Sequence, residues 1–98
     1  MRRAVVLSPD AGRQFRRLRA IERARLRDAM EARLGKEGAL VQTRNRFRLR
    51  RPSEMAEFEL RVGELRVFYR VARTQVQVVV IGKKRGDSVV IDGKRFVL

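Results

Sequence analysis

The sequence predicts a single α+β domain in which an N-terminal strand and a helical hairpin pack on a twisted antiparallel sheet. The chain has 98 residues, enough for one domain with one core. Apolar residues recur with helical spacing between residues 11 and 34, and runs typical of strands follow from residue 56 onward. Helices followed by several strands are typical of the α+β class, so we assign residues 1–98 to one domain.

The first element is a short apolar run at residues 4–7, which we interpret as a strand. Ser8, Pro9 and Asp10 follow it with the pattern of a helix start. They offer a hydroxyl N-cap, a proline at the first helical position and a carboxylate in the first turn. A helix is therefore expected to begin directly after this strand.

Two apolar stripes follow the helix start. The first comprises Ala11, Phe15 and Leu18, and the second comprises Leu26, Met30 and Leu34. On one continuous helix the second stripe would lie about 70° around from the first, at about 100° per residue. This shift, near Ala20–Ile21, predicts two helices packed as a hairpin; one long bent helix is the alternative. Gly35 and Gly38 are expected to end the helical region.

Residues 44–51 form a basic run with five arginines in eight positions, directly before Pro52. If the run is extended, alternate residues share a face. One face would then carry Arg44, Arg46, Arg48 and Arg50, while Phe47 and Leu49 would anchor the other. A row of arginines held in this way predicts a surface that binds phosphate groups. A merely solvated strand face is the alternative.

A hairpin is predicted at residues 56–71. Residues 56–62 alternate between apolar and charged side chains, as in a half-buried strand, and residues 65–71 return with apolar side chains on one face. Between them, Gly63–Glu64 places glycine at the first central position, as a type II′ turn requires.

The remaining strands lie in the C-terminal third of the chain. Residues 76–81 are apolar except for Gln77, which predicts a strand covered on both faces. Residues 89–91 and 96–98 flank Asp92–Gly93, a dipeptide that strongly favours a hairpin turn.

The charge of the chain is strongly unbalanced. There are 25 Lys and Arg residues against 11 Asp and Glu, which gives a net charge of +14. Such a surface attracts RNA, DNA, the ribosome or an acidic protein; solubility alone is the alternative. No apolar run is long enough to span a membrane, and the apolar run at residues 4–7 is too short for a signal peptide. We therefore expect a cytoplasmic protein that does not bind a membrane.

Cysteine and histidine are both absent from the sequence. A disulfide framework, a thiol nucleophile, a thiolate metal site and the usual zinc ligand and proton shuttle are therefore excluded. We expect neither a metal nor a cofactor.

Four segments of the sequence resemble one known family. The predicted hairpin reads ELRVGELRVFYRV from Glu59 to Val71, and IGKKRG follows from Ile81 to Gly86. TRNRFRLRRP, Thr43 to Pro52, precedes the hairpin, and IDGKRFVL, Ile91 to Leu98, closes the chain. In this order, and after a strand and two helices, the segments resemble the RelE/ParE toxin superfamily of toxin–antitoxin systems. The resemblance covers nearly the whole chain.

The resemblance implies a toxin with one of two activities. RelE-type members cut messenger RNA in the ribosomal decoding site, and ParE-type members inhibit DNA gyrase. Both are neutralised by a cognate antitoxin whose tail wraps the toxin. The chain is thus expected to be either a metal-independent, ribosome-dependent mRNA endonuclease or a non-catalytic gyrase inhibitor, and the fold alone does not choose between them.

The resemblance also implies roles for individual residues. Arg66, just after the turn, matches the arginine expected to contact the scissile phosphate, and Lys84 falls where RelE-type toxins carry a second catalytic arginine. Arg85 lies beside Lys84 and would join it at the phosphate, because cations stabilise the charge of the crowded phosphorane. Further RNA contacts are expected from Arg44, Arg46, Arg48, Arg50, Arg61 and Lys83.

The sequence departs from the RelE-type pattern at three positions. Glu57 and Glu59 replace two lysines in the strand before the turn, and Val90 replaces a C-terminal tyrosine. If the chain is a nuclease, Glu57 or Glu59 would act as the general base. The alternative is that these glutamates are structural ion-pair partners of nearby arginines. The departures as a group favour the gyrase inhibitor as the second hypothesis.

Overall fold

The structure, a computed structural model, describes residues 2–36, 43–49 and 56–97. The elements follow one another as β1 (Ala4–Leu7), α1 (Pro9–Arg17), α2 (Ala20–Met30), the π-helical turn η1 (Glu31–Lys36), β2 (Arg46–Arg48), β3 (Phe58–Val62), β4 (Leu65–Val71), β5 (Gln75–Arg85), β6 (Ser88–Ile91) and β7 (Lys94–Val97). This order confirms the predicted α+β class.

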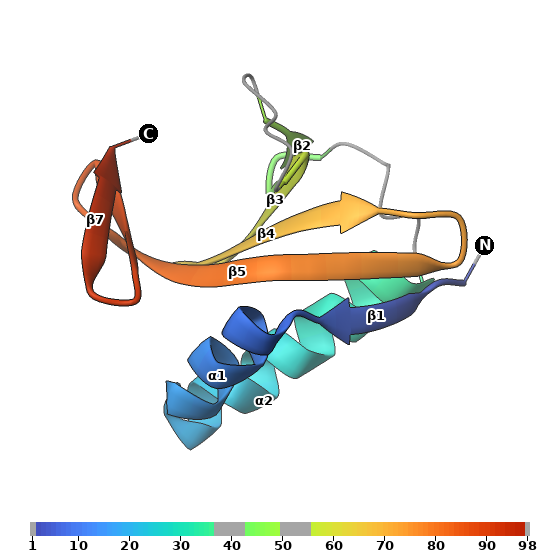
Figure 1. Ribbon diagram of the computed structural model, residues 1–98, viewed down its shortest axis with the longest axis horizontal. Helices are drawn as coiled ribbons and strands as arrows, with labels where there is room; N and C mark the ends of the chain where they lie inside the picture. Colours follow the sequence, from blue (N-terminus) through green and yellow to red (C-terminus); the bar gives the residue numbers. More distant parts are fainter. Residues whose placement is uncertain (1, 37–42, 50–55, 98) are drawn as a thin grey trace.

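The strands form one sheet in the order β2-β3-β4-β5-β6-β7, with each strand antiparallel to the next. β1 also joins this sheet, but it runs parallel to β5, so the sheet is not antiparallel throughout. β1 pairs with residues 75–78 of the long strand β5, and β6 pairs with residues 83–85. Both helices lie on one side of β5, and the β2–β3 pair and the β6–β7 hairpin rise on the other side (Figure 1).

The first helix begins as the sequence predicts. The hydroxyl Oγ of Ser8 accepts a hydrogen bond from the Ala11 N–H at 3.0 Å, and Pro9 occupies the first turn. The same hydroxyl donates to the carbonyl oxygen of Val79 at 2.6 Å. The N-cap therefore also fastens α1 to the central strand β5.

The predicted helical hairpin is confirmed, and the break lies at Leu18 and Arg19, slightly earlier than expected. Both residues have extended backbone, with ψ of 155° and 154°. The guanidinium of Arg23 donates to the carbonyl oxygen of Leu18. A side chain of α2 therefore supplies a hydrogen-bond donor to a carbonyl group at the end of α1. Gly35 does not end the helix, because it lies within η1, and Gly38 lies outside the described residues.

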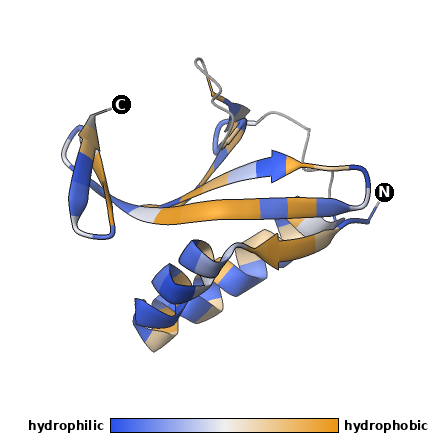
Figure 2. Ribbon diagram, viewed as in Figure 1, coloured by the Kyte–Doolittle hydropathy of each residue, from blue (hydrophilic) through white to orange (hydrophobic). Residues whose placement is uncertain are grey.

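The main core lies between the helices and the sheet. Its fully buried members include Leu26 and Leu34 from the helical layer and Leu60, Val67, Tyr69, Val76 and Val78 from the sheet. The middle of β5 is strongly hydrophobic in Figure 2, as the apolar run at residues 76–81 predicts. Its other face is less covered than expected, because Val79 and Val80 are half-buried and Gln77 is exposed.

Both predicted turns are present. Gly63 has φ of +58°, and Glu64 is not among the positive-φ residues, as a type II′ turn requires. Asp92 and Gly93 have φ of +52° and +78°, the pattern of a type I′ turn. These turns set the register of β3–β4 and of β6–β7. None of the described helices is long and apolar enough to cross a membrane.

Candidate nucleic-acid interface

The sheet face opposite the helices gathers several of the predicted site residues. In the β3–β4 register, Glu59 lies opposite Phe68 and Arg61 lies opposite Arg66. Arg66 in turn lies opposite Gly82 of β5, two residues before Lys84. Because alternate residues of a strand point to the same side, these side chains share one face. We call this face, which carries Glu59, Arg61, Arg66, Phe68 and Lys84, the outer face.

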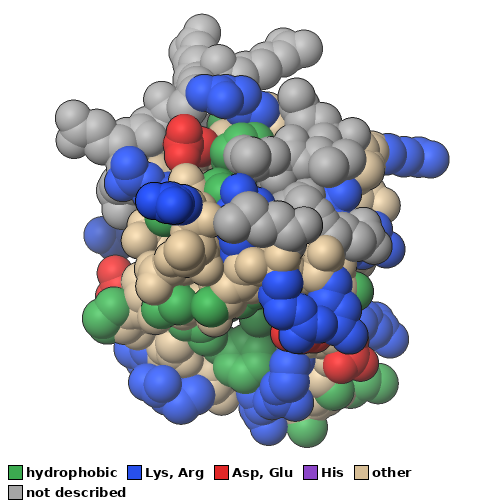
Figure 3. All heavy atoms as spheres, turned by 90° about the vertical axis from the view of Figure 1, so that its right-hand side faces the viewer, with side chains coloured by type: hydrophobic (Ala, Val, Ile, Leu, Met, Phe, Trp, Pro, Cys, Tyr) green, Lys and Arg blue, Asp and Glu red, His purple; other side chains and the backbone are tan. Residues whose placement is uncertain are grey.

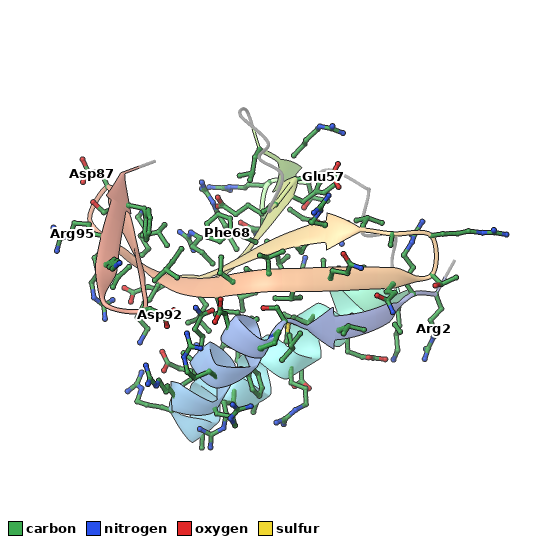
Figure 4. The ribbon with its side chains drawn as sticks, in the orientation of Figure 1. Arg2, Glu57, Phe68, Asp87, Asp92 and Arg95 are labelled. Atoms are coloured by element: carbon green, nitrogen blue, oxygen red, sulfur yellow. The ribbon has the colours of Figure 1, made fainter. Side chains whose placement is uncertain are left out.

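An apolar cluster lies on the outer face. Ala56, Phe68 and Val89 are its buried members, and the half-buried Leu49, Val80 and Ile91 pack around them. In Figure 4, Phe68 lies between the β2–β3 pair and the β6–β7 hairpin. Sequence reasoning missed this second core, because it joins residues that are distant in the chain.

Gly82 allows the C-terminal hairpin to approach the outer face closely. A β-carbon at Gly82 would lie 2.6 Å from Cγ1 of Val89, 2.8 Å from Cγ1 of Ile91 and 3.0 Å from the Val90 carbonyl oxygen. These separations are too short for any side chain. Gly82 within the IGKKRG segment is therefore required for β6 to pack this closely against β5.

Arg66 is buried, with 5% of its surface exposed, so it does not lie on a solvated strand face. Its Nη1 donates to the carbonyl oxygens of Gly63 at 2.7 Å and Leu65 at 3.0 Å. Its Nε has no hydrogen-bond partner among the described residues. Burial lowers the pKa of Arg66, and the neighbouring charge of Arg61 lowers it further. The turn carbonyls thus fix one side of the guanidinium, and the edge that includes Nε is buried beside the carboxylate of Glu59.

Glu59 is the acidic partner of these arginines. It is 2% exposed, and its Oε2 accepts a hydrogen bond from Nε of Arg61 at 2.7 Å. The same oxygen lies 3.8 Å from Nε of Arg66, too far for a hydrogen bond. A carboxylate that lies between two guanidinium groups is held in ion pairs with both of them. The geometry therefore favours the structural alternative for Glu59.

Glu57 has a more accessible position than Glu59. It lies just before β3 and is half-buried, and its backbone N–H donates to the carbonyl oxygen of Tyr69 at 3.0 Å. Only Phe58 separates it from Glu59, so an extended chain would place both carboxylates on one face. Of the two predicted bases, Glu57 is the one whose side chain retains contact with solvent.

Lys84 and Arg85 lie exposed at the end of β5. The Lys84 N–H donates to the carbonyl oxygen of Glu64 at 2.7 Å, which fixes this strand end to the β3–β4 turn. Nη1 of Arg85 lies 3.4 Å from Oε2 of Glu64, and both groups are exposed. The structure therefore brings the strand end and the turn that holds Arg66 side by side.

Lys83 does not share the outer face with Lys84. Its Nζ lies 2.7 Å from Oε2 of Glu22 in α2, and the two side chains are 27% and 13% exposed. The hydrogen bond from Lys83 is the largest cause of a pKa of about 2 for Glu22. The ammonium group of Lys83 therefore ties β5 to the helical layer, away from the outer face, and its contact with RNA stays a prediction.

The basic run at residues 44–51 does not form the continuous row of arginines that was expected. The strand β2 spans only Arg46–Arg48, and Arg44 lies in the preceding turn. Arg46 is 2% exposed and donates from Nη1 to the carbonyl oxygen of Arg33 at 2.8 Å. Arg46 thus supplies a donor to a carbonyl at the end of the helical region, where such groups lack partners, and its contact with RNA stays a prediction.

Two other arginines of this run are exposed. Arg44 is exposed in its turn, and Arg48 is exposed with its guanidinium carbon 5.7 Å from the centre of the Phe58 ring. Arg48 shares its strand face with Arg46, because the two are separated by one residue. Arg50 lies outside the described residues.

A polar network fastens the β6–β7 hairpin to α1, and sequence reasoning did not detect it. Nε2 of Gln14 donates to Oδ2 of Asp92 at 2.9 Å, and Nη2 of Arg13 donates to the same oxygen at 2.8 Å. The hydrogen bond from Gln14 is the largest cause that lowers the pKa of Asp92. Gln14 is 7% exposed, and nothing in the sequence around it distinguishes it from a surface residue.

Basic side chains are spread over the molecular surface. Figure 3 shows Lys and Arg side chains distributed across one face, with few Asp and Glu side chains among them. The part of the chain that the structure describes contains no group of three or more acidic, His or Cys side chains suited to a metal ion. No protein-family model matches this chain, and no curated protein matches it.

Proposed function

We propose that this chain is a toxin of the RelE/ParE type that cuts messenger RNA on the ribosome and uses the outer face to bind it. The observation that carries this proposal is the state of Arg66. Its Nη1 is fixed by two turn carbonyls, while its buried Nε has no hydrogen-bond partner among the described residues. The edge of a guanidinium that includes Nε is the one that binds two phosphate oxygens side by side. The net charge of +14 favours a polyanionic ligand.

The chemistry assigned to the outer face is attack by a ribose 2′-hydroxyl on the adjacent phosphorus. The new O2′–P bond forms as the bond from phosphorus to the 5′ oxygen breaks. A base takes the hydroxyl proton, and the departing 5′ oxygen accepts one. Arg66 holds the phosphate, and Lys84 and Arg85 neutralise the charge that develops on it. Of the two glutamates, Glu57 is the more exposed and is proposed as the base, because Glu59 lies between Arg61 and Arg66.

The partners that follow from this proposal are the ribosome, messenger RNA and a cognate antitoxin in the cytoplasm. The antitoxin would present acidic and apolar side chains, because the outer face combines arginines with the cluster around Phe68. Such a partner would cover Arg66 and thereby block RNA.

A second candidate is a non-catalytic inhibitor of DNA gyrase. The enclosure of Glu59 between two arginines favours it, because that carboxylate is then occupied as an ion-pair partner. A supercoiling assay with purified gyrase separates the two functions. Inhibition at micromolar protein, without any cutting of RNA, would support the inhibitor and contradict the nuclease.

The direct test is a purified translation reaction in which the messenger RNA is analysed after the protein is added. The wild-type protein should cut the translated message, and Arg66→Ala should abolish cutting. Arg70→Ala is the matched control, because Arg70 lies on the same strand and side of the sheet but is exposed. Circular dichroism of both variants checks folding. Equal cutting by Arg66→Ala and wild type would remove Arg66 from the site.

A further inference from the structure

The carboxylate of Glu59 lies where an anionic ligand of Arg66 would have to approach. Its Oε2 is 2.7 Å from Nε of Arg61 and 3.8 Å from Nε of Arg66. Both Glu59 and Arg66 are more than nine-tenths buried. The negative charge of Glu59 therefore lies between two positive charges, at the point where the outer face is expected to hold phosphate.

The register of the hairpin explains why an acid is present there. Arg61 and Arg66 lie directly opposite each other on β3 and β4. Two like charges in this position repel each other, although the half-buried Arg61 remains partly screened by solvent. Glu59 relieves this repulsion, so it stabilises the empty site.

Glu59 accepts a hydrogen bond from only one of the two arginines. Nε of Arg61 donates a short hydrogen bond to Glu59, while Nε of Arg66 has no hydrogen-bond partner within the described residues. A buried donor without a partner is costly. A phosphate oxygen could satisfy this donor, but the approaching anion would be repelled by the carboxylate of Glu59.

We propose that Glu59 is an internal competitor of RNA phosphate at Arg66. The carboxylate holds the site together while it is empty, and it weakens the binding of a phosphate to the same guanidinium. Glu59 is thus a positioning residue with a restraining effect and not the base. This inference rests on the proposed function only in taking RNA as the ligand of Arg66.

The test measures binding of a short fluorescein-labelled single-stranded RNA by fluorescence anisotropy at low salt. Glu59→Gln should bind this RNA about tenfold more tightly than wild type, because a neutral amide no longer repels the phosphate. Asp87→Asn is the control for total charge, since Asp87 is exposed in the turn between β5 and β6. Its effect should be less than about twofold. Equal effects of the two variants, or weaker binding by Glu59→Gln, would overturn the proposal.

A double variant shows whether the effect passes through Arg66. In an Arg66→Met background, Glu59→Gln should give no more tightening than Asp87→Asn gives in wild type. A full gain without Arg66 would overturn the proposal. If Glu59→Gln does not fold, Glu59→Asp replaces it, because the shorter side chain keeps the charge and withdraws it from Arg66. Tighter RNA binding by Glu59→Asp would support the proposal, and unchanged or weaker binding would overturn it.

The same titrations separate this inference from the proposed function. If Arg66→Met binds RNA as tightly as wild type, the proposed phosphate site fails and the inference fails with it. If Arg66→Met weakens binding but Glu59→Gln does not tighten it, only the inference fails. Absence of RNA cutting would contradict the proposed nuclease but not this inference, because RNA binding is measured without ribosomes.

Discussion

Oε1 of Gln14 accepts a hydrogen bond from the backbone N–H of Ile81 at 2.7 Å, and this contact bridges a gap at the edge of β5. β1 pairs with β5 only as far as Val78, and β6 begins to pair only at Lys83. The Ile81 N–H lies between these two partners and would otherwise be buried without an acceptor. The side chain of Gln14 thus takes the place of a strand and also holds the β6–β7 hairpin through Asp92.

Replacement of Gln14 by leucine should destabilise the fold. Gln14→Leu leaves the buried Ile81 N–H unpaired, so the free energy of unfolding should fall by about 2 kcal/mol. Urea unfolding followed by circular dichroism measures this change. Gln77→Leu is the control, because Gln77 is exposed on β5 and its change should stay within about 0.5 kcal/mol. Equal losses in the two variants would contradict the bridging role of Gln14.

The ion pair between Glu22 and Lys83 predicts a specific dependence of stability on pH. The pKa of Glu22 is lowered from 4.5 to about 2, chiefly by the hydrogen bond from Lys83. A lowered pKa means that the carboxylate stabilises the fold above pH 4.5, and this contribution is lost as the pH falls toward 2. Glu22→Gln should therefore cost about 1–2 kcal/mol at neutral pH.

The difference in unfolding free energy between wild type and Glu22→Gln should shrink as the solution is acidified and approach zero near pH 2. Urea titrations at successive pH values measure it. Glu31→Gln serves as the control, because Glu31 is 55% exposed and lies 3.8 Å from Arg2. Its effect should be less than about 0.5 kcal/mol at any pH. If the difference in unfolding free energy between wild type and Glu22→Gln stayed constant with pH, this result would contradict the ion pair between Glu22 and Lys83.

Two glycines should respond in opposite directions to substitution by alanine. Gly82→Ala places a β-carbon 2.6 Å from Val89 and 3.0 Å from the Val90 backbone, so the variant should lose about 2 kcal/mol or more of stability. Gly12→Ala meets only the flexible end of Arg16 at 3.4 Å within α1, and it should gain about 0.5–1 kcal/mol. Thermal unfolding of both variants shows whether each substitution raises or lowers the stability of the fold. An unchanged stability of Gly82→Ala would contradict the close packing of β6 against β5 at this glycine.

Local patterns predicted most of the fold. The Ser8-Pro9 helix start, the Gly63–Glu64 and Asp92–Gly93 turns, and the strands beside them are all present in the structure. Each depends on a few neighbouring residues whose backbone preferences agree. The parallel pairing of β1 with β5 could not be read in this way, because it joins segments about seventy residues apart and no local pattern specifies it.

The site was less predictable than the fold. Alternation placed Arg66, Arg61 and Glu59 on one face, but it could not show that Glu59 and Arg66 are buried. The run at residues 44–51 did not show that Arg46 is buried, because the charge of an arginine does not reveal whether a helix end requires its donors. Lys83 and Lys84 are adjacent in sequence and therefore point to opposite sides of β5.

Brief induction of the protein in cells, followed by mapping of the 5′ ends of cellular messenger RNA, tests whether the protein cuts translated messages. We predict prompt cuts within translated frames, which disappear when translation is blocked and in Arg66→Ala but persist in Arg70→Ala. Growth arrest without such cuts would contradict the nuclease and favour gyrase inhibition. Cuts that persist in Arg66→Ala would contradict the assignment of Arg66 to the scissile phosphate.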